Sequence, residues 1–453
     1  MVIENKTTLV SFFFIFCASL LVYRILDYTR TFRKKPDVKL GFFKAVHGII
    51  FGKNELHQLV YSPTAAEGHC CVFGGSGSGK TSAVLIPTLQ SWTGSSFTID
   101  ISGDIEPNVH CSHKIVYAPL EAKTPPYNIF GAVDQLGSQA EKDEALEKLA
   151  FQLMPENPNM NDAGLFFLRE GRKILTAALI AFYGRGADFV PICERLLSSN
   201  YAVVFEQIKA TQNKKAIKYI AGFDGANEQN TAGCYQACCS AVHLFGTNEL
   251  VQKSIRRSIG NELCLTPAAL NGHNVFISIP DEKLENLAPL LHILTAQMLD
   301  YMAARSNKEK NTILFCLDEF ASLGKLEITP ALRKFRKKNV RIMLLTQSLA
   351  DLDIIYGRNE RIAILNNCKF KLVLSCTDVD SQKYFSELSG SHEAKKETTT
   401  KSSTGTSSSI SYIEQPNIKP IELAKLTNNL ILFCAGDSFK LKKNYYFKRS
   451  HKG

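Results

Sequence analysis

Short apolar runs recur along this chain, and segments with helical periodicity separate most of them. The runs that we predict to be strands are His69–Phe73, Phe97–Ile101, Val275–Ile279, Thr312–Leu317, Val340–Leu345, Phe370–Leu374 and Leu430–Phe433. Short apolar strands that alternate with helices are typical of a doubly wound sheet, in which both faces are covered by helices. The pattern therefore predicts an α/β fold.

The pattern changes between residues 133 and 270, where long amphipathic stretches such as Asp162–Tyr183 recur with hardly any strand signal. Helical periodicity over that length indicates a set of packed helices. The apolar runs on either side, Tyr127–Phe130 and Asn274–Ile279, are predicted to be strands of the α/β part. We therefore expect a discontinuous α/β domain, 41–132 and 271–453, with an all-α domain inserted at 133–270.

The N-terminal segment is predicted to anchor the chain in a membrane. Residues 7–23 carry no charge, and at about 1.5 Å per helical residue they just cross a hydrocarbon core of about 30 Å. Basic residues crowd the C-terminal flank between Arg24 and Lys35, so the positive-inside rule places the rest of the chain in the cytoplasm. A cleaved signal peptide would carry its charge on the other flank and a small-residue cleavage site. Residues 1–40 are thus expected to form a single-pass anchor.

Composition narrows the class of protein without naming its partner. The chain has 453 residues and a formal net charge of +10, which permits an acidic partner such as nucleic acid or anionic lipid but does not require one. Its 13 cysteines show no paired C-x-x-C spacing, which argues against a zinc ribbon and a disulfide framework. Unpaired thiols in this number suit a reducing compartment.

A phosphate-binding loop follows the first predicted strand. The residues after His69–Phe73 fit G-x-x-x-x-G-K-[ST], and an apolar helix begins directly behind them. In this motif, successive backbone N–H groups converge on phosphate oxygens at a helix N-terminus. Lys80 is expected to reach the β and γ phosphates and Thr81 to hold Mg²⁺, whereas a flexible linker would lack the flanking strand and helix. The predicted ATP-binding residues are Gly74, Gly75, Ser76, Gly77, Ser78, Gly79, Lys80 and Thr81.

Two adjacent carboxylates, Asp318 and Glu319, end the apolar run Thr312–Leu317. An acidic residue at the end of a strand beside the phosphate loop can hold the magnesium shell, and a second one can orient or deprotonate the attacking water. We assign Asp318 the first role, as a metal ligand with Thr81, and Glu319 the second. A plain strand that ends in solvated acids is the alternative. A pair of this kind favours hydrolysis over phosphoryl transfer to a small molecule.

A third strand, Val340–Leu345, leads to Gln347, whose amide could sense the γ-phosphate. The segment before that strand, Ala331–Lys338, is densely basic. One of its arginines could act as a finger that reaches the nucleotide of a neighbouring subunit, although a solvated helix face would show the same pattern.

In the order of these motifs, the chain resembles the type IV secretion coupling proteins, the membrane-anchored ATPases of conjugative DNA transfer that include the TraD and TraG proteins. The resemblance runs from about Gly48 to the C-terminus. Besides the phosphate loop, it depends on Leu85–Leu89 with Trp92 and Gly94, on Leu317–Lys325, on Gln347–Leu352 closing on Tyr356 and Gly357, on Asn367–Cys368, and on the serine-rich Thr398–Ser411, which we predict to be a flexible loop.

This resemblance implies a RecA-like fold, similar to the FtsK and HerA motors, with an all-α insertion and a hexameric ring around a channel. It implies single-stranded DNA with its relaxase or relaxosome as cargo, type IV secretion channel proteins as partners, and the bacterial inner membrane as location. Position by position, it gives Arg336 as the arginine finger, together with Glu319 and Gln347 as catalytic residues. Two alternatives stay open: the same ATPase could recruit protein effectors, or the chain could be a nucleotide-gated receptor that barely hydrolyses ATP.

The chain departs from the family pattern in three places. Ser102 stands where relatives usually carry a lysine after the second strand. Only one membrane span is readable where most relatives have two. The chain ends in basic residues, without the long acidic tail by which some relatives recruit relaxosome partners.

Overall fold

The computed structural model describes residues 37–41, 46–156, 160–402 and 405–449. The predicted membrane span at residues 7–23 lies outside these ranges. None of the helices within them combines the length and the apolarity that crossing a bilayer requires.

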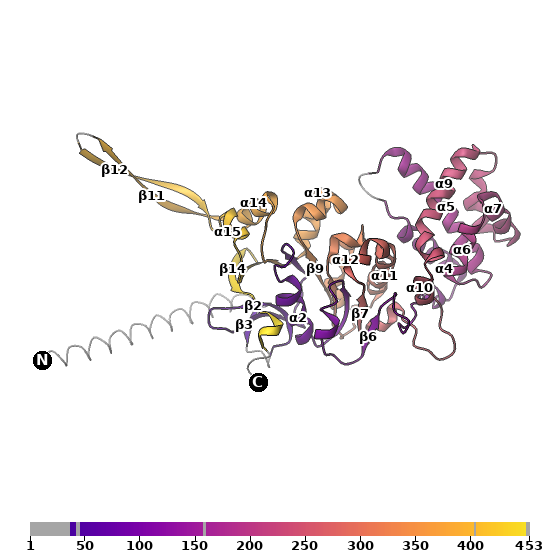
Figure 1. Ribbon diagram of the computed structural model, residues 1–453, viewed down its shortest axis with the longest axis horizontal. Helices are drawn as coiled ribbons and strands as arrows, with labels where there is room; N and C mark the ends of the chain where they lie inside the picture. Colours follow the sequence, from indigo (N-terminus) through magenta and orange to yellow (C-terminus); the bar gives the residue numbers. More distant parts are fainter. Residues whose placement is uncertain (1–36, 42–45, 157–159, 403–404, 450–453) are drawn as a thin grey trace.

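A twelve-stranded mixed sheet organises the described part of the chain, with the strand order β1-β3-β2-β14-β13-β10-β4-β9-β8-β5-β7-β6 (Figure 1). From β10 to β6 every neighbouring pair is parallel, and the remaining strands continue this sheet as an antiparallel extension. The parallel strands are β4 (Cys70–Phe73), β5 (Ser95–Asp100), β6 (Lys114–Tyr117), β7 (Asn274–Ser278), β8 (Ile313–Leu317), β9 (Val340–Thr346) and β10 (Phe370–Val373). The extension consists of β13 (Asn429–Cys434), β14 (Asp437–Lys442), β2 (Gly48–Lys53), β3 (Leu59–Pro63) and β1 (Lys39–Gly41). The predicted α/β class is confirmed.

The central strands β5, β8 and β9 are buried along their whole length because helices cover both faces of the sheet. Successive side chains point to opposite faces, so each strand contributes to two separate cores. On β4, Cys70 and Val72 join the core beneath α2 (Ile86–Ser91), whereas Cys71 and Phe73 join the core on the opposite face. Sequence runs without polar alternation therefore became the buried strands of the parallel region.

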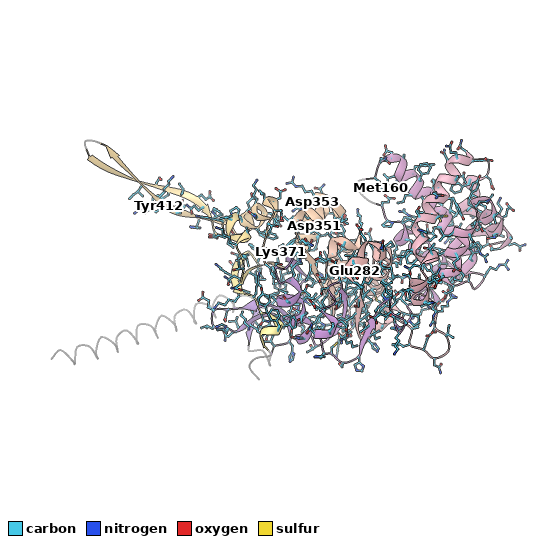
Figure 2. All side chains as sticks on the ribbon, viewed as in Figure 1. Met160, Glu282, Asp351, Asp353, Lys371 and Tyr412 are labelled. Atoms are coloured by element: carbon cyan, nitrogen blue, oxygen red, sulfur yellow. The ribbon has the colours of Figure 1, made fainter. Side chains whose placement is uncertain are left out.

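The serine- and threonine-rich stretch Thr398–Ser411, predicted to be a flexible loop, is instead part of a β-hairpin, so that prediction was wrong. β11 (Ser391–Ser402) pairs antiparallel with β12 (Gly405–Pro416) in one continuous register. The hairpin projects away from the sheet, and Tyr412 marks its course (Figure 2). A polar composition indicates exposure to solvent. It does not exclude a pair of hydrogen-bonded strands, because threonine is also a strand former.

Helices alone occupy the chain between Gly131 and Ser254 wherever the structure describes it, and they gather at one end of the molecule (Figure 1). Most of them begin behind an Asn, Asp or Ser whose side-chain oxygen accepts a backbone N–H of the first turn, which is the preferred N-cap chemistry. Ser138 and Glu141, for example, form a reciprocal capping box. The helices are α3 (Gly131–Asp134), α4 (Gln139–Leu153), α5 (Asp162–Tyr183), α6 (Phe189–Ser198), α7 (Tyr201–Ala210), α8 (Lys214–Ile220), α9 (Glu228–Thr247) and α10 (Glu249–Ser254).

The predicted strand at Tyr127–Phe130 is not formed. Tyr127 makes a single parallel bridge to Leu265, and the side chain of Asn128 then accepts the N–H of Phe130 in a tight turn that leads into α3. The run is apolar because it is buried where the helices meet the sheet, with Tyr127 donating to Gln297. A buried segment that pairs with no neighbouring strand can therefore show the same apolar pattern as a strand.

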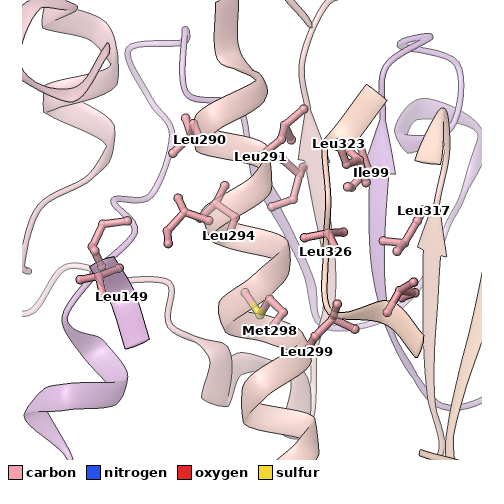
Figure 3. Close-up of a cluster of buried hydrophobic side chains, with 14 of the residues drawn as sticks. Ile99, Leu149, Leu290, Leu291, Leu294, Met298, Leu299, Leu317, Leu323 and Leu326 are labelled. Atoms are coloured by element: carbon pink, nitrogen blue, oxygen red, sulfur yellow. The ribbon is translucent and has the colours of Figure 1, made fainter. Parts of the chain in front are cut away.

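α11 (Leu284–Ala304) is buried on two sides and connects the helices to the sheet. Figure 3 shows Leu290 and Leu294 on its side nearer Leu149 of α4, and Leu291 and Leu299 on its side nearer the sheet. A helix that is apolar nearly all round belongs in an interior, and this one packs between two layers. The remaining helices of the α/β part are α12 (Ile328–Phe335), α13 (Leu349–Asn367), α14 (Val379–Leu388) and α15 (Pro420–Ala424).

Candidate nucleotide-binding site

The glycine loop lies between β4 and the helix η2 (Lys80–Leu85), which continues directly into α2. Gly77 and Gly79 have φ values of 69° and 96°, a left-handed conformation that glycine adopts without steric cost. Lys80 folds back over the loop, and its Nζ donates to the carbonyl oxygen of Gly74 at 2.7 Å. The loop and the start of the helix therefore form the concave set of N–H groups that phosphates bind.

The acidic pair reaches this loop from β8. Because β9 lies between β4 and β8 and all three are parallel, their carboxyl ends meet at one edge of the sheet. Thr81 Oγ1 donates to Asp318 Oδ2 at 3.2 Å, and Lys80 Nζ lies 3.8 Å from Glu319 Oε1. Glu319 has a φ of 43°, an uncommon conformation for a residue with a side chain and one that is often found at functional sites.

Asp318 is buried beside a second carboxylate. Burial raises its pKa to about 6, the charge of Glu319 adds to this effect, and Lys80 opposes it. The paired hydroxyl of Thr81 and carboxylate of Asp318 offer the oxygen ligands that Mg²⁺ prefers. The residues present therefore fit a magnesium ion, whose positive charge would further favour the ionised form of this carboxylate.

Gln347 follows β9 and reaches the same group of side chains. Its Nε2 donates to Glu319 Oε2 at 3.3 Å, whereas Lys80 approaches Oε1, so the two side chains contact different oxygens of this carboxylate. Lys80, Thr81, Asp318, Glu319 and Gln347, predicted from separate motifs, thus come together at one edge of the sheet.

Lys80, Thr81, Asp318 and Glu319 line a cleft of about 790 Å³, within the size range of sites for small molecules. Its other walls are formed by Ile101–Asp104, by Ser278–Glu282 and by the C-terminal Tyr446 and Phe447. Glu282, on one of these walls, is labelled in Figure 2. Motif reasoning missed the last two groups, because neither carries a local pattern that marks a nucleotide site.

Ser102, at the position where the resemblance implied a lysine, lines the cleft next to a structured turn. Its hydroxyl donates to Asp100 Oδ1 at 3.3 Å, and the same carboxylate accepts the N–H groups of Gly103, Ile105 and Glu106. The serine therefore helps to close a turn around Asp100 and presents no cation to the cleft.

Arg336 does not reach the phosphate loop of its own chain. It begins η8 (Arg336–Lys338), directly before β9, whereas Gln347 lies just beyond the other end of that strand. Its side chain is 64% exposed and pairs with Glu67, which itself precedes β4. Arg336 therefore lies at the amino edge of the parallel strands, away from the cleft.

A family model described as "Type IV secretory system Conjugative DNA transfer" matches residues 29–452. The chain belongs to this family. It is 22% identical over 406 residues to the type IV secretion system-coupling protein VirD4 of Bartonella henselae. This alignment covers 84% of this chain and 63% of that protein. It is 24% identical over 411 residues to the conjugal transfer protein TraG of Agrobacterium fabrum. This alignment covers 85% of this chain and 61% of that protein. The chain thus spans less than two thirds of the length of these relatives.

Among solved structures, the family member aligns with the plasmid coupling protein TrwB in complex with the non-hydrolysable ATP analogue ADPNP. The TM-score is 0.68 at 18% identity, over 85% of this chain and 87% of that one. It also aligns with VirB4 of Thermoanaerobacter pseudethanolicus, with a TM-score of 0.51 at 12% identity, over 89% and 98% of the two chains. At these identities the similarity establishes a shared mixed α/β fold with a large parallel sheet.

Proposed function

We propose that this family member is an inner-membrane ATPase that uses ATP and Mg²⁺ to drive relaxase-bound single-stranded DNA into a type IV secretion channel. The observation that carries the proposal is the convergence of Lys80, Thr81, Asp318 and Glu319 on one cleft. A site that only binds nucleotide has no need of the second carboxylate. We infer the DNA cargo and the secretion channel from membership of the family.

Each side chain has a role that its position suits. Backbone N–H groups of Gly75–Gly79 and the ammonium of Lys80 hold the phosphates. Thr81 and Asp318 would hold Mg²⁺, which would supply positive charge beside the phosphates. Glu319 orients the attacking water and accepts its proton. Gln347 donates to Glu319 and so keeps this carboxylate aimed into the cleft.

Arg336 acts in the site of the next subunit in a ring of six. Its exposure, and its position at the edge of the sheet opposite its own phosphate loop, leave it available to a neighbouring copy. An arginine finger stabilises charge in the transition state and contributes little to ground-state binding. Its ion pair with Glu67 must break in that assembly, at little cost because both side chains are largely exposed.

The parts of the chain divide this work. Residues 1–40 anchor the protein through the span at 7–23 and leave the remainder in the cytoplasm. Residues 41–132 and 271–453 form the nucleotide-binding domain. The helices of residues 133–270 form a separate inserted domain, which α11 joins to the sheet.

The test is ATP hydrolysis by the full-length chain in detergent, with and without single-stranded DNA at low salt. We expect DNA to stimulate hydrolysis and the stimulation to decline steeply with salt, because a motor holds DNA mainly by its phosphates. Lack of stimulation would contradict the motor function. Stimulation by a candidate effector protein alone would point to protein cargo.

Two variants separate binding from hydrolysis. Lys80→Ala should abolish both, whereas Glu319→Gln should lower kcat by about 100-fold or more and leave ATP binding nearly unchanged. Glu249→Gln, which alters an exposed carboxylate on α10, is the matched control and should behave as wild type. Undiminished turnover by Glu319→Gln would remove Glu319 from the mechanism.

A further inference from the structure

The last described segment of the chain returns to the nucleotide cleft. β14 lies beyond β10 and β13 on one side of the phosphate-loop strand β4, whereas the acidic pair follows β8 on the other side. After β14, the short helix η9 (Tyr446–Arg449) packs against η2, the helix that carries Lys80 and Thr81. The acidic pair and η9 therefore approach the phosphate loop from opposite sides.

Two contacts fasten this segment to the loop. Lys443 is 9% exposed, and its Nζ donates to the carbonyl oxygens of Ser78 at 2.7 Å and Leu426 at 3.4 Å. The ring of Tyr445 lies 3.0 Å from the place where a Cβ on Gly79 would be. These contacts hold the residues that follow in a fixed position next to the loop.

Those residues supply an aromatic wall. Tyr446 and Phe447 both line the cleft, and their rings meet edge to face with centroids 5.4 Å apart. Tyr446 packs on the core beneath α2, while Phe447 is 48% exposed. Among the described residues, the other walls carry no aromatic side chain: they combine glycine, serine and charged residues with a few aliphatic ones, so Tyr446 and Phe447 are the aromatic residues that line the cleft.

We propose that Phe447, supported by Tyr446, stacks on the base of the bound nucleotide; this inference deepens the proposed ATPase function and rests on it. With the γ-phosphate at Lys80 and the acidic pair, the phosphate chain runs along the first turn of η2. The base then lies at the end of the cleft remote from the acidic pair, where η9 packs on that helix. Stacking of bases on aromatic side chains is favourable and largely independent of base identity, because every base has a π-face.

The test compares binding of Mg-ATP with binding of inorganic tripolyphosphate and magnesium, which has no base, by titration calorimetry of the full-length chain in detergent. Phe447→Ala should weaken ATP binding by about 5- to 30-fold, the lower part of the range for loss of one stacked base. Tripolyphosphate binding should change less than twofold. Phe447→Trp should retain ATP affinity, whereas Phe447→Leu, which keeps apolar bulk without a ring, should lose part of it.

Two variants give contrasting signatures. Lys443→Met loosens the loop itself and should weaken ATP and tripolyphosphate equally. Tyr412→Ala removes an exposed aromatic of the hairpin, remote from the cleft (Figure 2), and should change neither. An equal loss of both ligands in Phe447→Ala, or no loss of ATP affinity, would overturn the stacking role. If wild type binds ATP no more tightly than tripolyphosphate, the base has no site. If wild type binds neither ligand, the proposed function itself fails.

Discussion

His69 makes the stability of the α/β core depend on pH. It directly precedes β4, and its ring is 2% exposed. The N–H of Ile342 donates to Nδ1 at 3.0 Å, so the ring proton is on Nε2, which donates to Leu332 O at 2.8 Å. Burial lowers the pKa of His69 to about 4, and the charges of Arg341 and Arg336 act in the same direction. The folded protein therefore holds a neutral ring.

The magnitude follows from the difference between the two states. In the unfolded chain the pKa of histidine is about 6.5, so between pH 6.5 and pH 4 the unfolded chain binds a proton that the folded chain does not. The stabilisation is complete above pH 6.5 and is lost as the pH falls towards 4. At about 1.4 kcal/mol per pKa unit, the folded state loses about 1.4 kcal/mol by pH 5.5 and about 2.5 kcal/mol by pH 4.5.

The assay is urea unfolding of wild type and His69→Gln at pH 7.5, 5.5 and 4.5. The chain has one tryptophan, Trp92, which directly follows α2, so its fluorescence reports on the α/β part. The variant should be less stable than wild type by about 1–3 kcal/mol at pH 7.5, because a buried hydrogen-bonding group loses its partner. That gap should narrow by about 1.4 kcal/mol at pH 5.5. Other titrating groups act in both proteins and cancel, so a gap that does not change with pH would refute the reasoning.

Three further substitutions, one of them with a matched control, test the packing and the site. Arg341 is buried on β9 and donates to two backbone carbonyls and a serine hydroxyl, so Arg341→Leu should lower the free energy of unfolding by about 2–4 kcal/mol in the same urea assay. Gly94→Ala would place a Cβ 2.0 Å from Thr312 O and should cost about 1–3 kcal/mol, whereas Gly137→Ala meets nothing within 4 Å and should cost less than 1 kcal/mol. Gln347→Glu places a third carboxylate beside the acidic pair and should slow ATP hydrolysis at least about tenfold; unchanged turnover would show that the amide does not position the carboxylate.

Local sequence determined the phosphate loop and the central strands. The spacing of Gly74–Thr81 requires left-handed glycines and a helix start, both of which depend on residues within one turn of each other. The parallel strands were readable because burial on both faces leaves no polar alternation. The acidic pair could also be predicted from local sequence, because two carboxylates that directly follow a buried strand must lie at the carboxyl end of that strand.

Two local patterns were ambiguous and misled the prediction. Tyr127–Phe130 is apolar because it fills the junction between helices and sheet, and periodicity cannot distinguish such a segment from a strand. Thr398–Ser411 is polar because it lies in a projecting hairpin, and composition cannot distinguish exposed strands from a loop. In both cases the deciding contact lies outside the segment.

Only the tertiary structure decided which distant residues share the cleft. Thr81 and Asp318 meet because β9 inserts between β4 and β8, and strand order is not written in any one strand. The same order returns the C-terminal Phe447 to the phosphate loop and leaves Arg336 at the opposite edge of the sheet. The sequence by itself thus determined the chemistry of each motif, which depends on neighbours along the chain. Long-range strand pairing determined which of these motifs act together.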